Sequence, residues 1–177
     1  MPEEKHGMDK FGFFGPSERH FVPSGGFCIS AFAISRKDED VLVLRPAKHE
    51  KWEKWAPNWK IYSPEALERE YKSWRFPSSY VKFGEHPDDT LRRIMEEQLG
   101  ISRYQVKSYR LVNYYSPSRR YQGEMHWDYC FMYNVSFNGS PTLKPWIQDI
   151  SYVQIKELRE EDFGSAQGSL IDVINTF

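Results

Sequence analysis

The sequence predicts an α/β fold in which helices cover both faces of a mixed sheet. Three patterns support this class: an apolar strand hairpin at residues 27–44, an amphipathic helix at 87–100, and two long strands within 105–137. Strand and helix patterns that alternate along one chain are typical of layered α/β folds. The 177 residues suggest one domain, and we expect residues 1–24 to form an N-terminal arm and 25–177 the folded domain.

The composition excludes several classes of protein. A net charge of −1 gives no general attraction to nucleic acids or anionic membranes. The longest apolar runs, such as 26–34, fall far short of the ~20 residues that span a bilayer. The first residues, MPEEKHGMDK, lack the pattern of a signal peptide. We therefore expect a cytoplasmic protein without a membrane partner, with reduced and buried thiols at Cys28 and Cys130.

The domain begins with a strand hairpin. Residues 27–35 and 41–44 are rich in Val, Ile, Phe and Leu, and the charged sequence at 36–40 separates them as a turn. Apolar residues at consecutive positions are typical of strands that are covered on both faces. We therefore expect this hairpin to lie centrally in the sheet.

Residues 46–73 form a tryptophan-rich insertion that ends in a predicted helix. Ser63 is a suitable N-cap, and Pro64 fits the first helical position. We expect the helix to run to about Trp74, because Pro77 disfavours helical backbone in the residue before it.

Trp52, Trp55 and Trp59 alternate with Lys and Glu in this insertion. Two interpretations remain open for them. The aromatic side chains pack on the surface of the domain or on a second subunit, which would give a homodimer. Alternatively they form a lid that stacks on the base of a nucleotide, with Trp52 and Trp55 as substrate-binding residues.

Pro87, Asp88 and Asp89 mark the start of the next helix, because carboxylates favour the positive end of the helix dipole. Gly100 is a suitable C-terminal stop. Between these ends, apolar side chains repeat with helical spacing on one face, at Leu91, Ile94, Met95 and Leu99.

Strands at about 105–115 and 124–137 follow, and then a short strand at 150–155 and a closing helix from Gly168 onward. The loop between the two long strands carries Arg119 and Arg120. These arginines either hold a phosphate group or belong to a solvated turn.

Glu124, His126 and Asp128 alternate along the second long strand and therefore share one of its faces. Same-face neighbours are ~6.7 Å apart along a strand, which lets two of the three side chains converge on one ion. A polar, partly exposed strand face explains the same pattern without a ligand.

Residues 79–101 resemble the Nudix box, the metal and diphosphate site of the Nudix hydrolases. That box runs Gly, five residues, Glu, seven residues, then Arg-Glu-apolar-any-Glu-Glu-any-Gly-apolar. The chain keeps this spacing without a gap, but Ser79 replaces the first Gly, and Ile94 and Gln98 replace two Glu. The positions that match are Glu85, Arg93, Met95, Glu97, Gly100 and Ile101. Flanking sequences resemble the family too, at 40–45, 74–79 and 156–158.

The resemblance implies a Nudix-type α/β/α sandwich with a mixed sheet and an inserted helix before the box. The family's metal-binding carboxylates occupy the positions of Ile94, Glu97 and Gln98, so one anion remains where three are usual. Gln98 offers a neutral oxygen, and Glu124 offers a carboxylate from the strand. We expect Mg²⁺ or Mn²⁺ to bind weakly, if at all.

The resemblance also implies catalytic roles for Glu85, Arg93 and Glu97. In the family the arginine braces the site by pairing with the first glutamate of the box. A simple helix-surface pair between Arg93 and Glu97, four residues apart, is the alternative. Lys82, with Arg119 and Arg120, would contact the substrate.

Two functions remain open. The first is Mg-dependent hydrolysis of a nucleoside diphosphate-linked compound by weakened catalytic machinery. The second is a catalytically inactive Nudix-fold module that binds a nucleotide, a protein or RNA. The kept Glu85, Arg93 and Glu97 favour the first function, and the loss of two carboxylates favours the second.

Overall fold

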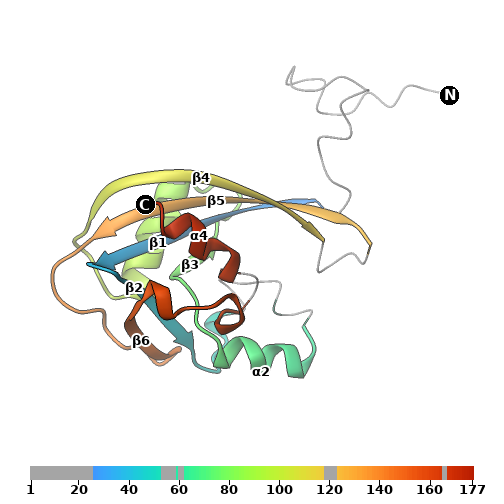
Figure 1. The fold of residues 1–177 in the computed structure, drawn as a ribbon, viewed down its shortest axis with the longest axis horizontal. Coiled ribbons are helices and arrows are strands. Elements are labelled where there is room, and N and C mark those ends of the chain that lie inside the picture. The colour runs from blue at the N-terminus through green and yellow to red at the C-terminus, as the bar shows by residue number, and fades with distance from the viewer. Residues whose placement is uncertain (1–25, 53–58, 60–61, 118–122, 165–166) are drawn as a thin grey trace, which may run out of the picture.

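A mixed sheet of six strands lies at the centre of the molecule (Figure 1). The computed structural model describes residues 26–52, 59, 62–117, 123–164 and 167–177. Five strands are hydrogen-bonded in the order β4-β5-β1-β2-β6, and β3 pairs with β1. β1 and β5 run parallel, whereas the other pairs are antiparallel. The strands span Phe27–Lys37 (β1), Asp40–Pro46 (β2), Ser78–Tyr80 (β3), Gln105–Pro117 (β4), Met125–Ser136 (β5) and Ile147–Gln154 (β6).

Helices lie on both faces of this sheet, which confirms the predicted fold class (Figure 1). The α-helices span Pro64–Lys72 (α2), Pro87–Arg93 (α3) and Ile171–Ile174 (α4). A π-helical turn, η4, continues α3 over Ile94–Gln98. Short 3-10 turns precede α4 at Ile155–Glu157 (η5), Glu160–Asp162 (η6) and Gln167–Leu170 (η7).

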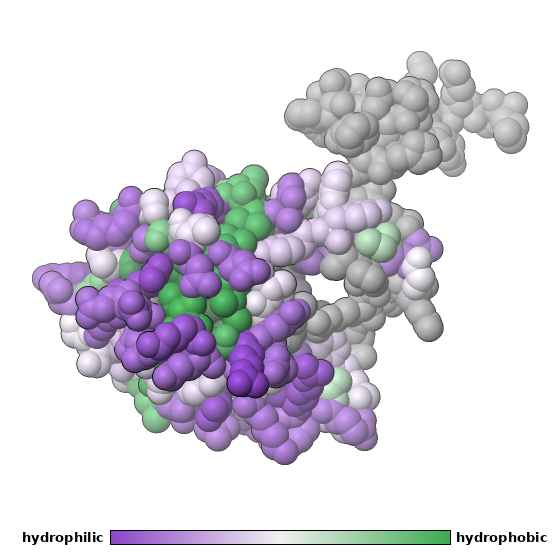
Figure 2. All heavy atoms as spheres, in the orientation of Figure 1, coloured by the Kyte–Doolittle hydropathy of each residue, from purple (hydrophilic) through white to green (hydrophobic). Residues whose placement is uncertain are grey.

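The two faces of β1 belong to two separate hydrophobic clusters. Ala31 and Ala33 pack in a cluster with the apolar face of α3 and η4. Phe32 and Ile34 pack on the other side with Ile174 of α4. Figure 2 shows apolar side chains gathered over the middle of the face that carries α4, with hydrophilic residues around them. Alternation along β1 therefore decides which side of the sheet each helix covers.

The predicted strands are all present. The hairpin forms as expected, although its strands extend into the charged sequence and leave a tight turn in which Asp38 has a φ of 53°. The two long strands lie within two residues of their predicted limits. The last strand begins at Ile147, three residues before its prediction.

The predicted helix starts are also correct, but two helices end early. The Ser63 hydroxyl accepts a hydrogen bond from the Ala66 amide (3.2 Å), as an N-cap should. α2 ends at Lys72 instead of Trp74, because the backbone of Trp74 and Arg75 pairs with Asp162 and Leu44. The closing helix is a 3-10 turn and only four residues of α-helix.

The surface role that we expected for the tryptophans is wrong for Trp52 and Trp59. Both are buried in the cluster under α3, with exposed fractions of 2% and 1%. Their rings stack on each other with centroids 5.6 Å apart. The indole N–H of Trp52 donates to the carbonyl of Trp146 (2.6 Å), so its polar atom is satisfied inside the core.

A buried ion pair lies against these rings. The Arg75 guanidinium donates to Glu70 Oε2 (3.0 Å), and both side chains are almost fully buried. The guanidinium carbon of Arg75 lies 4.9 Å from the ring centroid of Trp59 and 5.7 Å from that of Trp52. Trp52 and Trp59 therefore connect α2 to the core, and their burial leaves neither side chain accessible to a ligand or a second subunit.

Some predictions fall outside the described part of the chain. Trp55 and residues 1–25 lie there, so the boundary of the N-terminal arm stays a prediction. Among the residues that the structure does describe, none of the helices has the length and apolar character of a bilayer span.

We predict that Trp52→Ala lowers the free energy of unfolding by about 3–5 kcal/mol, because it empties a core site and removes a satisfied hydrogen bond. Urea unfolding followed by circular dichroism measures this change. Leu143→Ala is the control, since Leu143 is 60% exposed, and it should stay within about 0.5 kcal/mol of the wild type. Equal stability of the two variants would contradict the burial of Trp52.

Candidate active site

The segment that resembles the box folds as a strand, a turn and a helix. β3 pairs with β1, and the chain then turns at 82–85, where the Glu85 amide donates to the Lys82 carbonyl (2.9 Å). α3 begins with His86 as its N-cap and Pro87 at its first turn. The helical segment ends at Gln98 with Leu99 as its C-cap, and Gly100 follows with a φ of +69°, which suits glycine.

The apolar spacing predicted a regular α-helix up to Gly100, but the helix in the structure is irregular. Residues Ile94–Gln98 form a π-helical turn, in which the Leu99 amide donates to the carbonyl of Ile94. Single π turns inside α-helices occur frequently at functional sites. The turn changes the direction of each later side chain, so a position in the regular helical repeat does not fix where Glu97 points.

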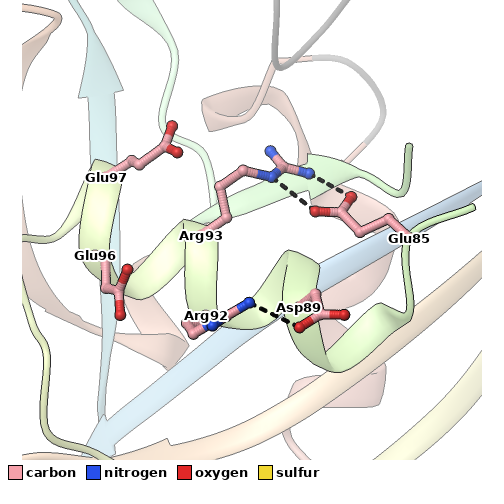
Figure 3. A pocket seen from close by; sticks show the side chains of 6 residues that line it. All are labelled: Glu85, Asp89, Arg92, Arg93, Glu96 and Glu97. Atoms are coloured by element: carbon pink, nitrogen blue, oxygen red, sulfur yellow. Dashed lines mark hydrogen bonds and ion pairs between the residues drawn. The ribbon is translucent and has the colours of Figure 1, made fainter. Parts of the chain in front are cut away.

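Arg93 and Glu85 form a two-point ion pair at the centre of this segment (Figure 3). Arg93 Nε donates to Glu85 Oε1 (3.0 Å), and Nη2 donates to Oε2 (2.8 Å). Glu85 also accepts from the Lys82 amide (2.9 Å) and the Thr90 hydroxyl (2.7 Å). The predicted brace is thus formed, and the alternative partner, Glu97, lies away from the Arg93 guanidinium in Figure 3.

These hydrogen bonds stabilise the charged form of Glu85. They lower its pKa from about 4.5 to about 2, with the bonds from Arg93 as the largest cause and partial burial acting in the opposite direction. The exposed fractions of the two side chains are only 10% for Arg93 and 15% for Glu85. The pair therefore holds the turn against α3 over the whole physiological pH range.

Ser79 belongs to the same network, which the sequence did not indicate. Its hydroxyl accepts from Arg93 Nη1 (2.8 Å), while Arg93 Nη2 donates to the carbonyl of Tyr80 (3.1 Å). The side chain that replaces the expected glycine is thus a further contact between β3 and α3. Only its hydrogen-bonding capacity could have suggested this role.

The two residues that stand in place of glutamates, Ile94 and Gln98, do not face solvent. Ile94 is fully buried and packs in the cluster between α3 and β1. Gln98 has an exposed fraction of 1%, and its Nε2 donates to the carbonyl of Ser78 (2.7 Å). The Oε1 atom of Gln98 has no hydrogen-bond partner among the described residues, so a buried oxygen is left unsatisfied there.

An open, polar pocket lies beside the brace on the outer side of the helix (Figure 3). Arg92 and Asp89 form an exposed ion pair across it (2.8 Å). Glu96 and Glu97 are both exposed, and in Figure 3 their carboxylates point away from each other. The pocket residues are Glu85, Asp89, Arg92, Arg93, Glu96 and Glu97, so its charge is net negative.

These donors fit one weakly held divalent ion and not a cluster of ions. Mg²⁺ prefers several oxygen ligands and keeps bound waters. Glu97 supplies one carboxylate, Ile94 supplies no donor, and the Ser78 carbonyl already accepts from Gln98. The unsatisfied Oε1 of Gln98 is buried one residue along the chain from Glu97 and offers a neutral oxygen.

The structure does not bring the other predicted site residues to the pocket. Lys82 is exposed on the turn next to Glu85, and only its backbone takes part in the network. Glu124 directly precedes β5 and is not among the residues that line the pocket with Glu97. Trp52 is a core residue, and Trp55, Arg119 and Arg120 lie outside the described residues.

The sequence matches no protein family and no curated protein, but the fold has many solved counterparts. A MutT protein from Methanosarcina mazei Go1 is similar with a TM-score of 0.58 and 13% identity, over 85% of this chain and 94% of that chain. The Escherichia coli ORF135 protein gives a TM-score of 0.56 and 17% identity, over 85% and 89%. The NUDIX domain of Shewanella oneidensis NrtR, solved with ADP ribose, gives 0.52 and 10% identity, over 97% of both chains.

The brace should make stability depend on pH in a defined way. The pKa of Glu85 is about 2 in the folded protein and about 4.5 in the unfolded chain, so its contribution is complete above about pH 5 and is lost as the pH falls towards 2. We predict that Glu85→Gln lowers the free energy of unfolding by about 2–3 kcal/mol at pH 7, and that this difference shrinks through the same range.

Urea unfolding at several pH values measures this difference. Asp89→Asn is the matched control, because it breaks an exposed arginine pair on the same helix and should change stability by less than about 1 kcal/mol. A Glu85→Gln deficit that stays constant from pH 7 to pH 2 would show that the charge of Glu85 is not its cause.

Proposed function

We propose, from the Nudix hydrolase fold of this chain, that it hydrolyses nucleoside diphosphate-linked compounds with one divalent ion, Mg²⁺ or Mn²⁺. The observation that carries this proposal is the complete Arg93–Glu85 brace beside the acidic pocket that contains Glu97. A charged pair with so little exposure loses much of its hydration, which costs free energy. A fully hydrogen-bonded pair at this place fits a functional site that needs a fixed loop geometry.

Each residue has a separate role in this proposal. Glu97 holds the ion, which would neutralise diphosphate charge and orient the attacking water when bound. Arg93 and Glu85 are positioning residues, because their polar atoms are already engaged with the turn and β3. Lys82 is exposed at the edge of the same turn, where its charge can attract a phosphate group.

Structural neighbours and the charge of the pocket support the proposed substrate class. The NUDIX domain of NrtR binds ADP ribose, and a similar Caenorhabditis elegans protein is an Ap4A hydrolase. Both ligands contain phosphoanhydride bonds between nucleoside groups or sugars. An acidic pocket accepts such anions only together with a cation, which is why we propose a metal-dependent reaction.

Binding without cleavage is the second candidate function, and Gln98 favours it. A carboxylate at this position would place an oxygen against the Ser78 carbonyl, and only a cation between them would make that contact favourable. The Gln98 amide closes the same contact directly with a hydrogen bond of 2.7 Å. The helix and β3 therefore hold together without metal, as a module that only binds a nucleotide would require.

Calorimetric titration with Mg²⁺ and Mn²⁺, with and without ADP-ribose, tests both functions. We predict that Glu97→Gln abolishes ion binding and that Gln98→Glu strengthens it at least about fivefold, since a further charge at about 4 Å contributes ~1–4 kcal/mol. Glu96→Gln is the control, because that neighbouring carboxylate points away from Glu97 in Figure 3. We leave Ile94 unchanged, because a glutamate there would enter the core.

Hydrolysis assays on the same samples separate the two candidates. Phosphoanhydride cleavage that is lost in Glu97→Gln supports the hydrolase. ADP-ribose binding without cleavage in the wild type supports the binding module. A protein that binds neither ion nor nucleotide would contradict both functions.

A further inference from the structure

Three side chains with different donor atoms meet at the start of β1 and β5. Cys28 Sγ lies 2.6 Å from Asp128 Oδ1, and His126 Nε2 lies 3.5 Å from the same oxygen. One ligand atom from each of the three residues lies within 4.8 Å of the other two. No other group of three His, Cys, Asp or Glu residues in the described part of the chain is gathered in this way.

The parallel pairing of β1 and β5 creates this arrangement. Cys28 stands opposite Asp128 in the register, and His126 precedes Asp128 by two residues on the same face. The sequence indicated that two of Glu124, His126 and Asp128 could converge. It did not indicate the third member, Cys28, because a separation of 100 residues hides the contact.

This cluster is separate from the pocket on α3. Cys130 and Met132, on the same face of β5 as Asp128, pack with Ile174 of α4. The opposite face of β5 packs with α3 through residues such as Tyr133, whose hydroxyl donates to Asp88 (2.6 Å). The sheet therefore lies between the two places.

An ion can reach the cluster from solvent. The side chains of His126 and Asp128 are 23% and 33% exposed. Cys28 is partly buried, which corrects our expectation that both thiols are buried, while Cys130 is buried as predicted. Partial exposure leaves room for a water molecule as a further ligand.

We propose that Cys28, His126 and Asp128 form a binding site for a divalent transition metal of the zinc class. Thiolate and imidazole donors select Zn²⁺ or Co²⁺ over Mg²⁺, which prefers oxygen donors. Three protein ligands and one water complete the tetrahedral geometry that zinc favours. The thiol proton that now lies between Cys28 and Asp128 leaves to solvent when the metal binds.

The geometry requires only small movements. Zinc bonds of about 2.0–2.3 Å in a tetrahedron place ligand atoms about 3.3–3.6 Å apart. The distance of 3.5 Å between His126 and Asp128 already fits, and the sulfur must move back from the oxygen by about 1 Å. Side-chain rotation supplies this change, and the bound ion then joins β1 to β5 where their pairing begins.

Cobalt spectroscopy on the full chain tests the proposal. Co²⁺ is added in the presence of excess Mg²⁺, so that oxygen-only sites such as the Glu97 pocket are occupied. We predict a thiolate-to-cobalt charge-transfer band that saturates at one equivalent and disappears when Zn²⁺ is added. The absence of this band in the wild-type protein would overturn the proposal.

Variants locate the ligands. Cys28→Ser should remove the band and weaken Zn²⁺ binding by at least about 100-fold, and Asp128→Asn should weaken it by about 10-fold or more. Cys130→Ala is the matched control, because it removes the other cysteine of the chain, two residues from Asp128 on the same strand face. A band that survives Cys28→Ser but is lost in Cys130→Ala would overturn the assignment.

Alkylation of the unaltered protein gives a test that does not depend on the folding of variants. Zn²⁺ should protect Cys28 from a thiol reagent, as peptide mass spectrometry would show, and chelation should restore its labelling. Equal labelling of Cys28 with and without saturating Zn²⁺ would overturn the proposal. Glu97→Gln should leave this protection unchanged, which separates the result from the proposed hydrolase activity.

Discussion

The strict alternation of side chains along β1 is the constraint on which the rest of the structure depends. Ala31 and Ala33 point to the side of α3, and their small size lets the helix approach the sheet closely. Phe32 and Ile34 point to the other side and fill the space under the short α4. Because β1 also pairs with β3 and β5, its register fixes the positions of the box-like turn and of the Cys28 cluster.

At the candidate active site, Ile94 and Gln98 stand where the Nudix box has carboxylates, and hydrogen bonds from Gln98 and Arg93 join the helix to β3. Three carboxylates on one helix face repel one another unless a cation neutralises them. In this chain an apolar side chain and an amide occupy two of these positions, so the contact between helix and β3 depends on the Gln98 bond to Ser78 and on Arg93. These contacts join the helix to β3 through protein atoms alone.

The sequence predicted the features that periodicity controls. The apolar positions of the central helix are all buried, and the strands lie at the alternating and consecutive apolar residues, whereas the parallel pairing of β1 with β5 was not predicted. The resemblance to the Nudix box implied the pair of Glu85 and Arg93, beside the alternative of Glu97, and the structure forms the pair with Glu85. Predictions failed where long-range packing decides: Trp52 and Trp59 stand among charged residues in the sequence, yet both are buried, Trp52 with a hydrogen bond to Trp146 and Trp59 under the guanidinium of Arg75. The π turn also escaped prediction, because no local residue pattern specifies it.

Tyr80 shows how closely the two proposed sites are connected. Its backbone carbonyl accepts a hydrogen bond from Arg93. Its side chain lies on the face of Cys28 and Asp128. The pKa of the phenol is raised mainly by burial and further by the negative charges of these two residues. The two sites nevertheless select different ions, because one offers oxygen atoms alone and the other offers sulfur and nitrogen as well. The pairing of β1 with β5 brings Cys28 and Asp128 together, whereas Glu97 is positioned by the π-helical turn on the other side of the sheet.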